Sequence, residues 1–431
     1  MEFPDAAAVD PLLDDVAFPH FAVARQRPPT PTVDDAAAAA RDAVGALPLD
    51  RVPAGGTVAV GLGSRGITDV VPVARAVVDG LAARGFDPVV VPAMGSHGGA
   101  TPEGQREALA ALGLTPEALG CPVDARTSTD VVGSAGGLPV HVATAAREAD
   151  GVLVVNRVKP HTNFTGRVES GLCKMATVGL GKQPGARTVH RRAFRDGYVT
   201  AITEALQVVA DATPFLGGVA IVENAADETA SVTGLRATDL PDAEADLLDR
   251  ARAHLPTLPV DDLDVLVVER IGKDVSGTGM DPNVTGRYGL LGGPSGDGLA
   301  DRIAVLGLTE TTHGNASGIG VADVTTVDAL GSVDLATTYA NVLTSGSLRR
   351  SRLPVALPDE ASALTAALTT AGPYDPETAR VAWIRDTSHL TSFRVSRGLV
   401  DEVAASPHVT VGDPSPVAVS DGVLEPPDLP E

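Results

Sequence analysis

The chain has 431 residues, enough for two or three domains, and its 44% hydrophobic and 20% charged residues are typical of a globular protein. A formal charge of −22 argues against nucleic-acid binding, because contacts with phosphates need a basic face. The apolar runs are only of strand length, and the first residues lack the pattern of a secretion signal. We therefore expect a cytoplasmic protein with no membrane and no nucleic acid among its partners.

Apolar strand-like runs alternate with helix-like segments through the first half of the chain. Residues 1–34 contain proline clusters and are expected to be irregular. After them we expect helices at 34–47, 70–84, 101–112 and within 187–209, and strands at 57–61, 86–92, 149–156 and 216–223. Such alternation predicts a Rossmann-like, largely parallel sheet covered by helices.

A second section begins after the proline-containing linker at 255–259. Its expected strands are 263–269, 301–308, 380–384 and 392–395, whereas the proline- and aspartate-rich end from residue 413 is expected to fray. The fold class is therefore α/β with two domains. We place an N-terminal cofactor-binding domain at 1–257 and a C-terminal α/β domain at 258–431.

Lysine is rare in this chain. Only four of the 33 basic residues are lysines, namely Lys159, Lys174, Lys182 and Lys273, and all four follow apolar strands in glycine-rich segments. An amine can lose its proton and act as a nucleophile, which a guanidinium cannot do. Lysines in such a chain are therefore candidates for sites that need an amine.

Residues 61–66 read Gly-Leu-Gly-Ser-Arg-Gly between a strand and a helix. Glycines there let the backbone approach an anion at a helix N-terminus, and Arg65 suits a carboxylate or phosphate. A dinucleotide site needs an acidic residue at the end of the next strand, where Pro92 is followed by Ala93 and Met94. The alternatives are an anion site, a plain tight turn and, with least support, a dinucleotide site.

Two histidines follow strands whose carboxyl ends are expected at one edge of the sheet. His97 lies between glycines after the second strand, and His161 follows Lys159 and Pro160 after the third. Two imidazoles at one mouth can supply an acid and a base on opposite sides of a carbon atom. The alternative for either histidine is a structural role in its loop.

A glycine-rich loop at 169–182 carries Lys174 and Lys182, and His190 follows at the start of an arginine-rich helix. The loop could also be a solvated connection, and Cys173 is expected to be buried filler. Two cysteines cannot form a disulfide framework or an iron–sulfur site. Neither a zinc-binding helix with two spaced histidines nor a nucleophile elbow occurs.

Taken in order, these segments resemble the nickel-pincer lactate racemase family. The resemblance covers roughly residues 50–290 and rests on Gly63-Ser64-Arg65, Gly95-Ser96-His97, Lys159-Pro160-His161, Gly171-Leu172-Cys173-Lys174, His190 and Lys273. It implies a cofactor in a cleft between the two domains. That cofactor is the nickel-pincer nucleotide, pyridinium-3,5-bisthiocarboxylic acid mononucleotide, joined to a lysine and holding a nickel ion.

The resemblance also implies a role for each matched residue. Lys174 is the expected tether and His190 the nickel ligand, whereas His97 and His161 are the acid/base pair. Arg65 and Lys273 are expected to bind the substrate carboxylate or polarise its oxygen. The remaining residues expected to bind the cofactor are Gly61, Gly63, Ser64 and Lys182.

The implied activity is isomerisation of a 2-hydroxy acid, with the cofactor supplied by separate biosynthetic enzymes. Leu62 replaces a usual acidic residue, the stretch from His161 to Lys174 is three residues longer than in the lactate enzyme, and Glu269 and Arg270 precede Lys273. These differences favour a substrate other than lactate. The alternatives are an oxidoreductase of the NAD type and a non-catalytic protein that carries a cofactor or metal.

Overall fold

The computed structural model describes residues 3–289 and 298–430, which divide into two compact units. The N-terminal unit comprises Pro29–His161 and Thr165–Leu255, and the C-terminal unit comprises Met1–Pro28, Thr162–Phe164 and Pro256–Glu431. The division near residue 255 falls in the proline-containing linker. The first 28 residues, which the sequence analysis places in the N-terminal domain, belong to the C-terminal unit.

Within the described part of the N-terminal unit, five strands form one sheet in the order β3-β2-β6-β7-β8. The first four strands in this order are mutually parallel and β8 is antiparallel to β7. Their bounds are β2 (Thr57–Leu62), β3 (Asp87–Pro92), β6 (Gly151–Arg157), β7 (Phe215–Glu223) and β8 (Thr229–Arg236). Buried runs of valine and leucine form the central strands, which confirms the predicted parallel sheet.

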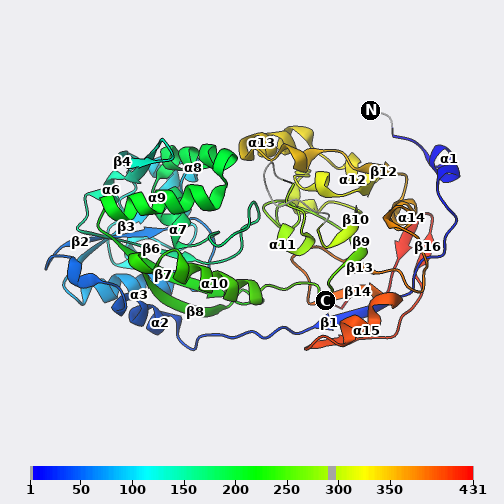
Figure 1. Cartoon of the computed structure of the whole chain (residues 1–431), viewed down its shortest axis with the longest axis horizontal. Helices are drawn as coiled ribbons and strands as arrows, with labels where there is room; N and C mark the ends of the chain where they lie inside the picture. Colours follow the sequence, from blue (N-terminus) through cyan, green and yellow to red (C-terminus); the bar gives the residue numbers. More distant parts are fainter. Residues whose placement is uncertain (1–2, 290–297, 431) are drawn as a thin grey trace. The chain divides into compact units, whose positions relative to one another are not determined.

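Helices cover both faces of this sheet (Figure 1). Against one face, α2 (Ala36–Gly45) and α3 (Val70–Ala82) pack their alanine and valine side chains on alternate residues of β2, β6 and β7. On the other side lie α8 (Lys182–Asp196) and α9 (Tyr198–Ala212). The unit also contains α4 (Pro102–Ala110), α5 (Pro116–Leu119), α6 (Thr144–Arg147), α7 (Leu172–Lys174) and α10 (Asp242–Ala253).

The predicted helix cap at Thr101 is confirmed, since its hydroxyl accepts a hydrogen bond from the Gly104 amide at 3.1 Å. The hairpin formed by β4 (Thr129–Ala135) and β5 (Leu138–Ala143) is absent from the sequence prediction. Many of its residues are only half-buried, so it lacks the continuous apolar pattern by which the sheet strands are recognised.

The C-terminal unit contains a mixed sheet with the order β12-β11-β10-β9-β13-β14-β1-β15 among the described residues. The strands from β12 to β13 in this order are parallel, whereas β14, β1 and β15 join in antiparallel pairs. Their bounds are β1 (Phe21–Gln26), β9 (Leu263–Val268), β10 (Ala300–Val305), β11 (Val324–Thr326), β12 (Val355–Leu357), β13 (Val381–Ile384), β14 (Ser392–Ser396) and β15 (Val409–Val411).

Helices α1 (Ala6–Val9), α11 (Pro282–Thr285), α12 (Val327–Gly331), α13 (Leu335–Ser345), α14 (Glu360–Ala371) and α15 (Val400–Ala404) complete this unit. The buried face of α14 packs on β9, β10 and β11. Both units are therefore α/β, as predicted.

Two of the predictions for the ends of the chain are wrong. The lead-in at 1–34 is not irregular throughout, because Phe21–Gln26 forms β1, and Phe21 packs edge-on against Trp383 with ring centroids 5.6 Å apart. The end beyond residue 413 is not simply frayed, since β16 (Ala418–Ser420) and β17 (Val423–Glu425) form a hairpin that buries Leu424. The pairing partners of β1 lie far away in the sequence, and β16 and β17 have only three residues each, so local sequence patterns do not reveal these strands.

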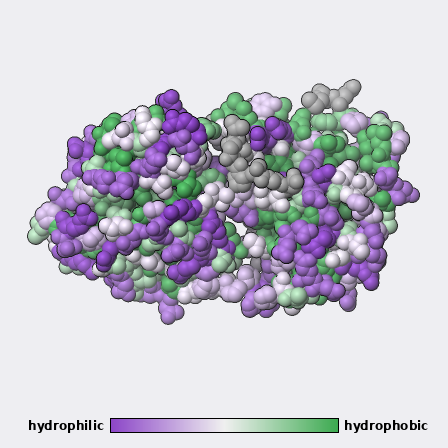
Figure 2. Space-filling view, viewed as in Figure 1, coloured by the Kyte–Doolittle hydropathy of each residue, from purple (hydrophilic) through white to green (hydrophobic). Residues whose placement is uncertain are grey.

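No helix of the described chain is both long and apolar enough to cross a membrane. Polar and charged side chains are spread over much of the visible surface of both units, with apolar patches between them (Figure 2). This distribution agrees with the high net charge of the sequence.

Candidate functional site

The candidate site lies in the N-terminal unit, where three parallel strands end at one edge of the sheet. Leu62 at the end of β2 pairs with Pro92 of β3 and, in the same register, lies beside Val155 of β6. The loops that follow therefore leave the sheet from neighbouring positions, which is where open parallel sheets build binding sites. They carry Ser64 and Arg65, His97, and His161.

The imidazole of His97 is held by the hydroxyl of Ser64, with 2.6 Å between Oγ and Nδ1. Burial lowers the pKa of His97, and the positive charges of Arg65 and Lys174 lower it further. The ring is therefore held neutral at physiological pH, with Nδ1 engaged by Ser64. In the tautomer in which Nδ1–H donates to the Ser64 hydroxyl, Nε2 can accept a proton.

The amine of Lys174 lies 2.5 Å from Nε2 of His161. Burial lowers the pKa of Lys174 to about 8, with a contribution from Arg65 and an opposing one from Glu169. A lysine with this pKa has an uncharged amine far more often than an exposed lysine. The pair therefore combines a nucleophilic amine with an imidazole, and the roles expected for the two residues stay predictions.

His190 lies on α8, and its Nδ1 is 3.0 Å from the hydroxyl of Tyr198 at the start of α9. The two rings meet edge to face with centroids 5.7 Å apart. Burial lowers the pKa of His190, with a smaller effect from the charge of Lys174, and burial raises the pKa of Tyr198. In the tautomer in which Nδ1–H donates to the Tyr198 hydroxyl, Nε2 has a lone pair that can bind a metal ion.

The backbone at Lys174 is unusual. The short helix α7 ends at Lys174 and continues directly into a π-helical turn at Met175–Gly179, and π turns occur frequently at functional sites. The turn packs closely on the end of β3, since a Cβ atom on Gly179 would lie 2.6 Å from the carbonyl oxygen of Ala93. This segment fixes Lys174 near the loop of His97.

A buried carboxylate organises the loop of His161. Glu169 is 1% exposed, and its oxygens accept hydrogen bonds from the amides of His161 and Gly166 and from the guanidinium of Arg252, the last at 2.6 Å. The hydroxyl of Thr165 is a further donor at 3.2 Å. Glu169 thereby fixes the backbone that carries His161.

Replacing Glu169 by alanine is expected to lower the free energy of unfolding by about 1–3 kcal/mol, because buried amide groups lose their acceptor. The matched control is Asp249→Ala, which removes another carboxylate partner of Arg252, one whose side chain is 73% exposed. An exposed ion pair of this kind is worth at most about 1 kcal/mol. Chemical denaturation of both variants measures the difference, and equal losses would contradict the role given to Glu169.

Two other residues with predicted roles, Lys273 and Lys182, lie in different surroundings from the histidines and Lys174. Lys273 belongs to the C-terminal unit, where its amine donates to the carbonyl of Gly277 and lies 3.4 Å from Oδ1 of Asn341. Lys182 is 1% exposed, and its amine is enclosed by protein groups. The structure thus brings together Arg65, His97, His161, Lys174 and His190 within one unit.

The glycines at 61 and 63 have packing roles. A Cβ atom on Gly61 would lie 2.9 Å from Cγ1 of Val154, and one on Gly63 would lie 3.3 Å from Cε of Met175. Both glycines therefore permit close packing beneath the loop. Their assignment to cofactor binding stays a prediction.

Sequence reasoning missed Glu169 and Tyr198 as parts of this site. In the sequence Glu169 is only the start of the glycine-rich loop, and Tyr198 is the first residue of α9, two residues after the end of α8. For Glu169, the signal in the sequence is an acidic residue only eight positions after His161. Tyr198 gives no comparable signal, because its approach to His190 depends on how α8 and α9 pack.

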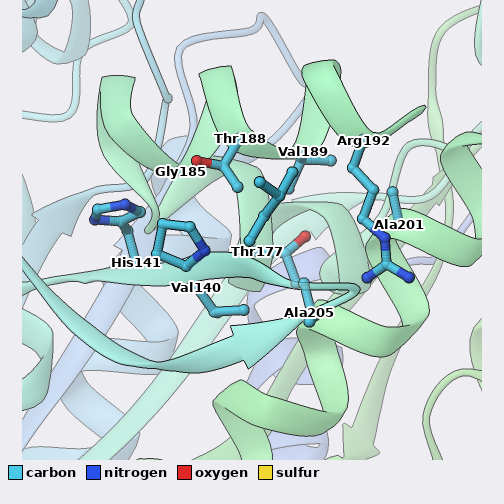
Figure 3. Close-up of a pocket in the computed structure, with 12 residues that line it drawn as sticks. Val140, His141, Thr177, Gly185, Thr188, Val189, Arg192, Ala201 and Ala205 are labelled. Carbon is cyan, nitrogen blue, oxygen red and sulfur yellow. The ribbon is translucent and has the colours of Figure 1, made fainter. Parts of the chain in front are cut away.

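A small cavity lies between β5, α8 and α9 (Figure 3). Its lining includes Val140, His141, Thr177, Val189 and Ala205, and its volume is only about 10 Å³. That volume is about the minimum for a single water molecule. The cavity is therefore a packing defect and not a substrate site.

Two of the three comparisons with known proteins find no match. The chain matches no protein-family model, and no curated protein matches it. Among solved structures it is similar to the lactate racemase apoprotein from Thermoanaerobacterium thermosaccharolyticum, with a TM-score of 0.48 and 11% sequence identity over 80% of this chain and 81% of that one. Identity and overlap at this level carry no conclusion about activity.

Among the described residues, no group of three or more histidine, cysteine, aspartate or glutamate side chains is arranged to hold a metal ion. The chemistry available at the site is that of the imidazoles of His97 and His190, whose pKa values are lowered, the imidazole of His161, one amine of lowered pKa and a guanidinium. These groups can bind an anion, exchange protons and form a covalent bond through the amine.

Proposed function

We propose that the chain is a racemase or epimerase of a 2-hydroxy acid that uses a nickel-pincer nucleotide attached to Lys174. The observation that carries the proposal is the grouping of Lys174 and His190 with the three residues of the sheet-edge loops, Arg65, His97 and His161. Lys174 contacts His161, and its charge acts on both His97 and His190.

The residues present suit the proposed cofactor. A covalent link needs an amine that can lose its proton, and the lowered pKa of Lys174 meets this requirement. Nickel accepts a neutral imidazole, and His190 is held neutral with Nδ1 bonded to Tyr198. Lys174 would thus hold the nucleotide and His190 would complete the nickel coordination.

The chemistry that this cofactor supplies when bound is reversible acceptance of a hydride from the α-carbon of the substrate. Arg65 would bind the substrate carboxylate, since its guanidinium offers paired donors that match a carboxylate. One of His97 and His161 would take the proton of the substrate hydroxyl, and the other would serve the opposite enantiomer. Ser64 and Glu169 would keep the two imidazoles in place.

Lys273 is proposed as a second group for the substrate carboxylate or hydroxyl oxygen. A substrate other than lactate is favoured by Leu62 and by Glu269 and Arg270, which differ from what a lactate pocket leads us to expect. The proposed partners are the small-molecule 2-hydroxy acid and separate enzymes that make the cofactor. We place this activity in the cytoplasm.

Dinucleotide binding at residues 61–66 has less support. Packing against Val154 already accounts for Gly61, and β3 ends at Pro92 without the acidic residue that would hold a ribose. A non-catalytic carrier would need Lys174 and His190 but would have no use for two further imidazoles beside them.

The test is mass spectrometry of the peptide that contains Lys174, together with nickel analysis. The protein is produced in its own host or in a host given the cofactor-making enzymes. A nucleotide-sized adduct on Lys174 with about one nickel per chain is the expected result. An unmodified Lys174 without nickel, in a host shown to make the cofactor, would reject the proposal.

A further inference from the structure

A buried lysine–glutamine pair lies beneath the loop of His97. Lys182 is 1% exposed and Gln105 is fully buried. The amine of Lys182 donates to the carbonyl oxygen of Pro92 at 2.6 Å and to Oε1 of Gln105 at 2.8 Å. In turn, Nε2 of Gln105 lies 3.3 Å from the carbonyl oxygen of Gly95 and 3.4 Å from that of His97. One continuous set of hydrogen bonds therefore links Lys182 to the loop.

Lys182 determines which way the amide of Gln105 faces. An ammonium group has donors only, so the amide oxygen of Gln105 must point toward Lys182. The amide nitrogen is then left for the loop carbonyls. A neutral apolar residue at position 182 would remove this preference and leave two buried acceptors without a donor.

The backbone of Lys182 supports a specific role for its side chain. Its φ angle of 52° lies in the left-handed region, which is unfavourable for a residue with a Cβ atom. Residues held in this region persist where the surrounding structure requires them, and they cluster at functional sites. Here the conformation directs a long side chain inward at the first residue of α8.

The loop has little freedom to shift around this contact. A Cβ atom on Gly98 would lie 2.5 Å from the carbonyl group of Gly104 at the start of α4. The amide of Gly95 donates to the carbonyl of Gly179 at 3.1 Å, and the imidazole of His97 is hydrogen-bonded to the hydroxyl of Ser64. The amide nitrogen of Gln105 contacts the carbonyl oxygens of Gly95 and His97 within this loop.

We propose that Gln105, oriented by Lys182, is a positioning residue for His97. It holds the carbonyls of Gly95 and His97 so that the imidazole keeps its contact with Ser64. The inference rests on the proposed function for the catalytic importance of His97. The positioning itself can be measured in the protein without any cofactor.

The first variant is Gln105→Met, which removes both the donor and the acceptor but keeps an unbranched side chain of similar length. In the loaded enzyme, kcat is expected to fall about tenfold to a hundredfold with KM unchanged, as for a small misplacement of a reacting group. The adduct on Lys174 and the nickel content are expected to remain. The matched control is Gln183→Met, the same change at an exposed position adjacent to Lys182.

The independent readout is the imidazole ¹⁵N–¹H correlation spectrum of the full-length, cofactor-free protein. The signals of His97 are identified by their loss in His97→Gln. In the wild type the Nδ1 signal of His97 is expected to report the hydrogen bond to Ser64. In Gln105→Met the His97 signals are expected to shift toward those of an imidazole without that hydrogen bond. Gln183→Met is expected to give the wild-type spectrum.

A second variant, Gln105→Glu, keeps an acceptor for Lys182 but cannot donate to the loop carbonyls. If the pair serves only to hold the fold together, this variant should leave the His97 signals and kcat as in the wild type, and the inference is then wrong. Altered His97 signals with a preserved melting temperature support it, also where Gln105→Met is too unstable to study. A protein that never carries the adduct on Lys174 would reject the proposed function without changing this readout.

Discussion

Replacing Lys174 by arginine is expected to abolish both the adduct and the isomerase activity. The pKa of Lys174 is lowered to about 8, whereas a guanidinium keeps its proton at any pH at which the protein is folded. The charge at this position is retained, so the loss would report on nucleophilic chemistry and not on electrostatics. Intact-mass measurement, nickel analysis and an assay with a panel of 2-hydroxy acids measure the effect.

The control for this variant is Lys159→Arg, which changes another of the four lysines and leaves the proposed tether in place. It is expected to retain the adduct. The pH dependence of Lys174 adds a further check on cofactor-free protein. Because burial lowers its pKa, an amine-directed reagent should modify Lys174 with a midpoint near pH 8, well below the ordinary value for lysine. A midpoint near that ordinary value would contradict the buried environment described for it.

Replacing His97 or His161 by glutamine, one at a time, is expected to lower kcat by about 10²–10⁴, the usual contribution of a general acid or base. Glutamine keeps a polar side chain but cannot exchange a proton near neutral pH. The adduct and the nickel are expected to remain in both variants, since neither histidine is the proposed metal ligand.

The control is His20→Gln, an exposed histidine in the C-terminal unit, which is expected to have wild-type kinetics. The double variant should cost less than the product of the two single losses, because groups that act together are not additive. Unchanged turnover in both single variants would favour the non-catalytic carrier instead.

The predictable part of the fold is the part with continuous apolar patterns. Buried strands such as Gly151–Arg157 and Leu263–Val268 are recognisable because every residue of the central run faces protein. Phe21–Gln26 was missed because its pairing partners, β14 and β15, lie more than 360 residues further along the chain. Local sequence carries no information about such a partner.

The same distinction applies to the site. Residues with unusual chemistry in glycine-rich loops, such as Lys174 and His97, can be recognised from the sequence. The groups that hold them cannot, because Glu169, Tyr198 and Gln105 are common residue types in ordinary positions. Lys182 is a further example, since the sequence does not reveal that its amine donates to Pro92 and Gln105, and its expected cofactor contact stays a prediction.

The position of β1 in the sheet has a consequence for how the protein is made. The first sheet strand of the C-terminal unit along the chain is Phe21–Gln26, and the other strands come only after residue 256, so nearly all of the N-terminal unit is an insertion within it. A ribosome releases β1 first and its neighbours β14 and β15 last. The inserted unit, which is continuous except for residues 162–164, can fold while synthesis proceeds, whereas β1 must wait as an unpaired apolar segment until nearly the entire chain has emerged.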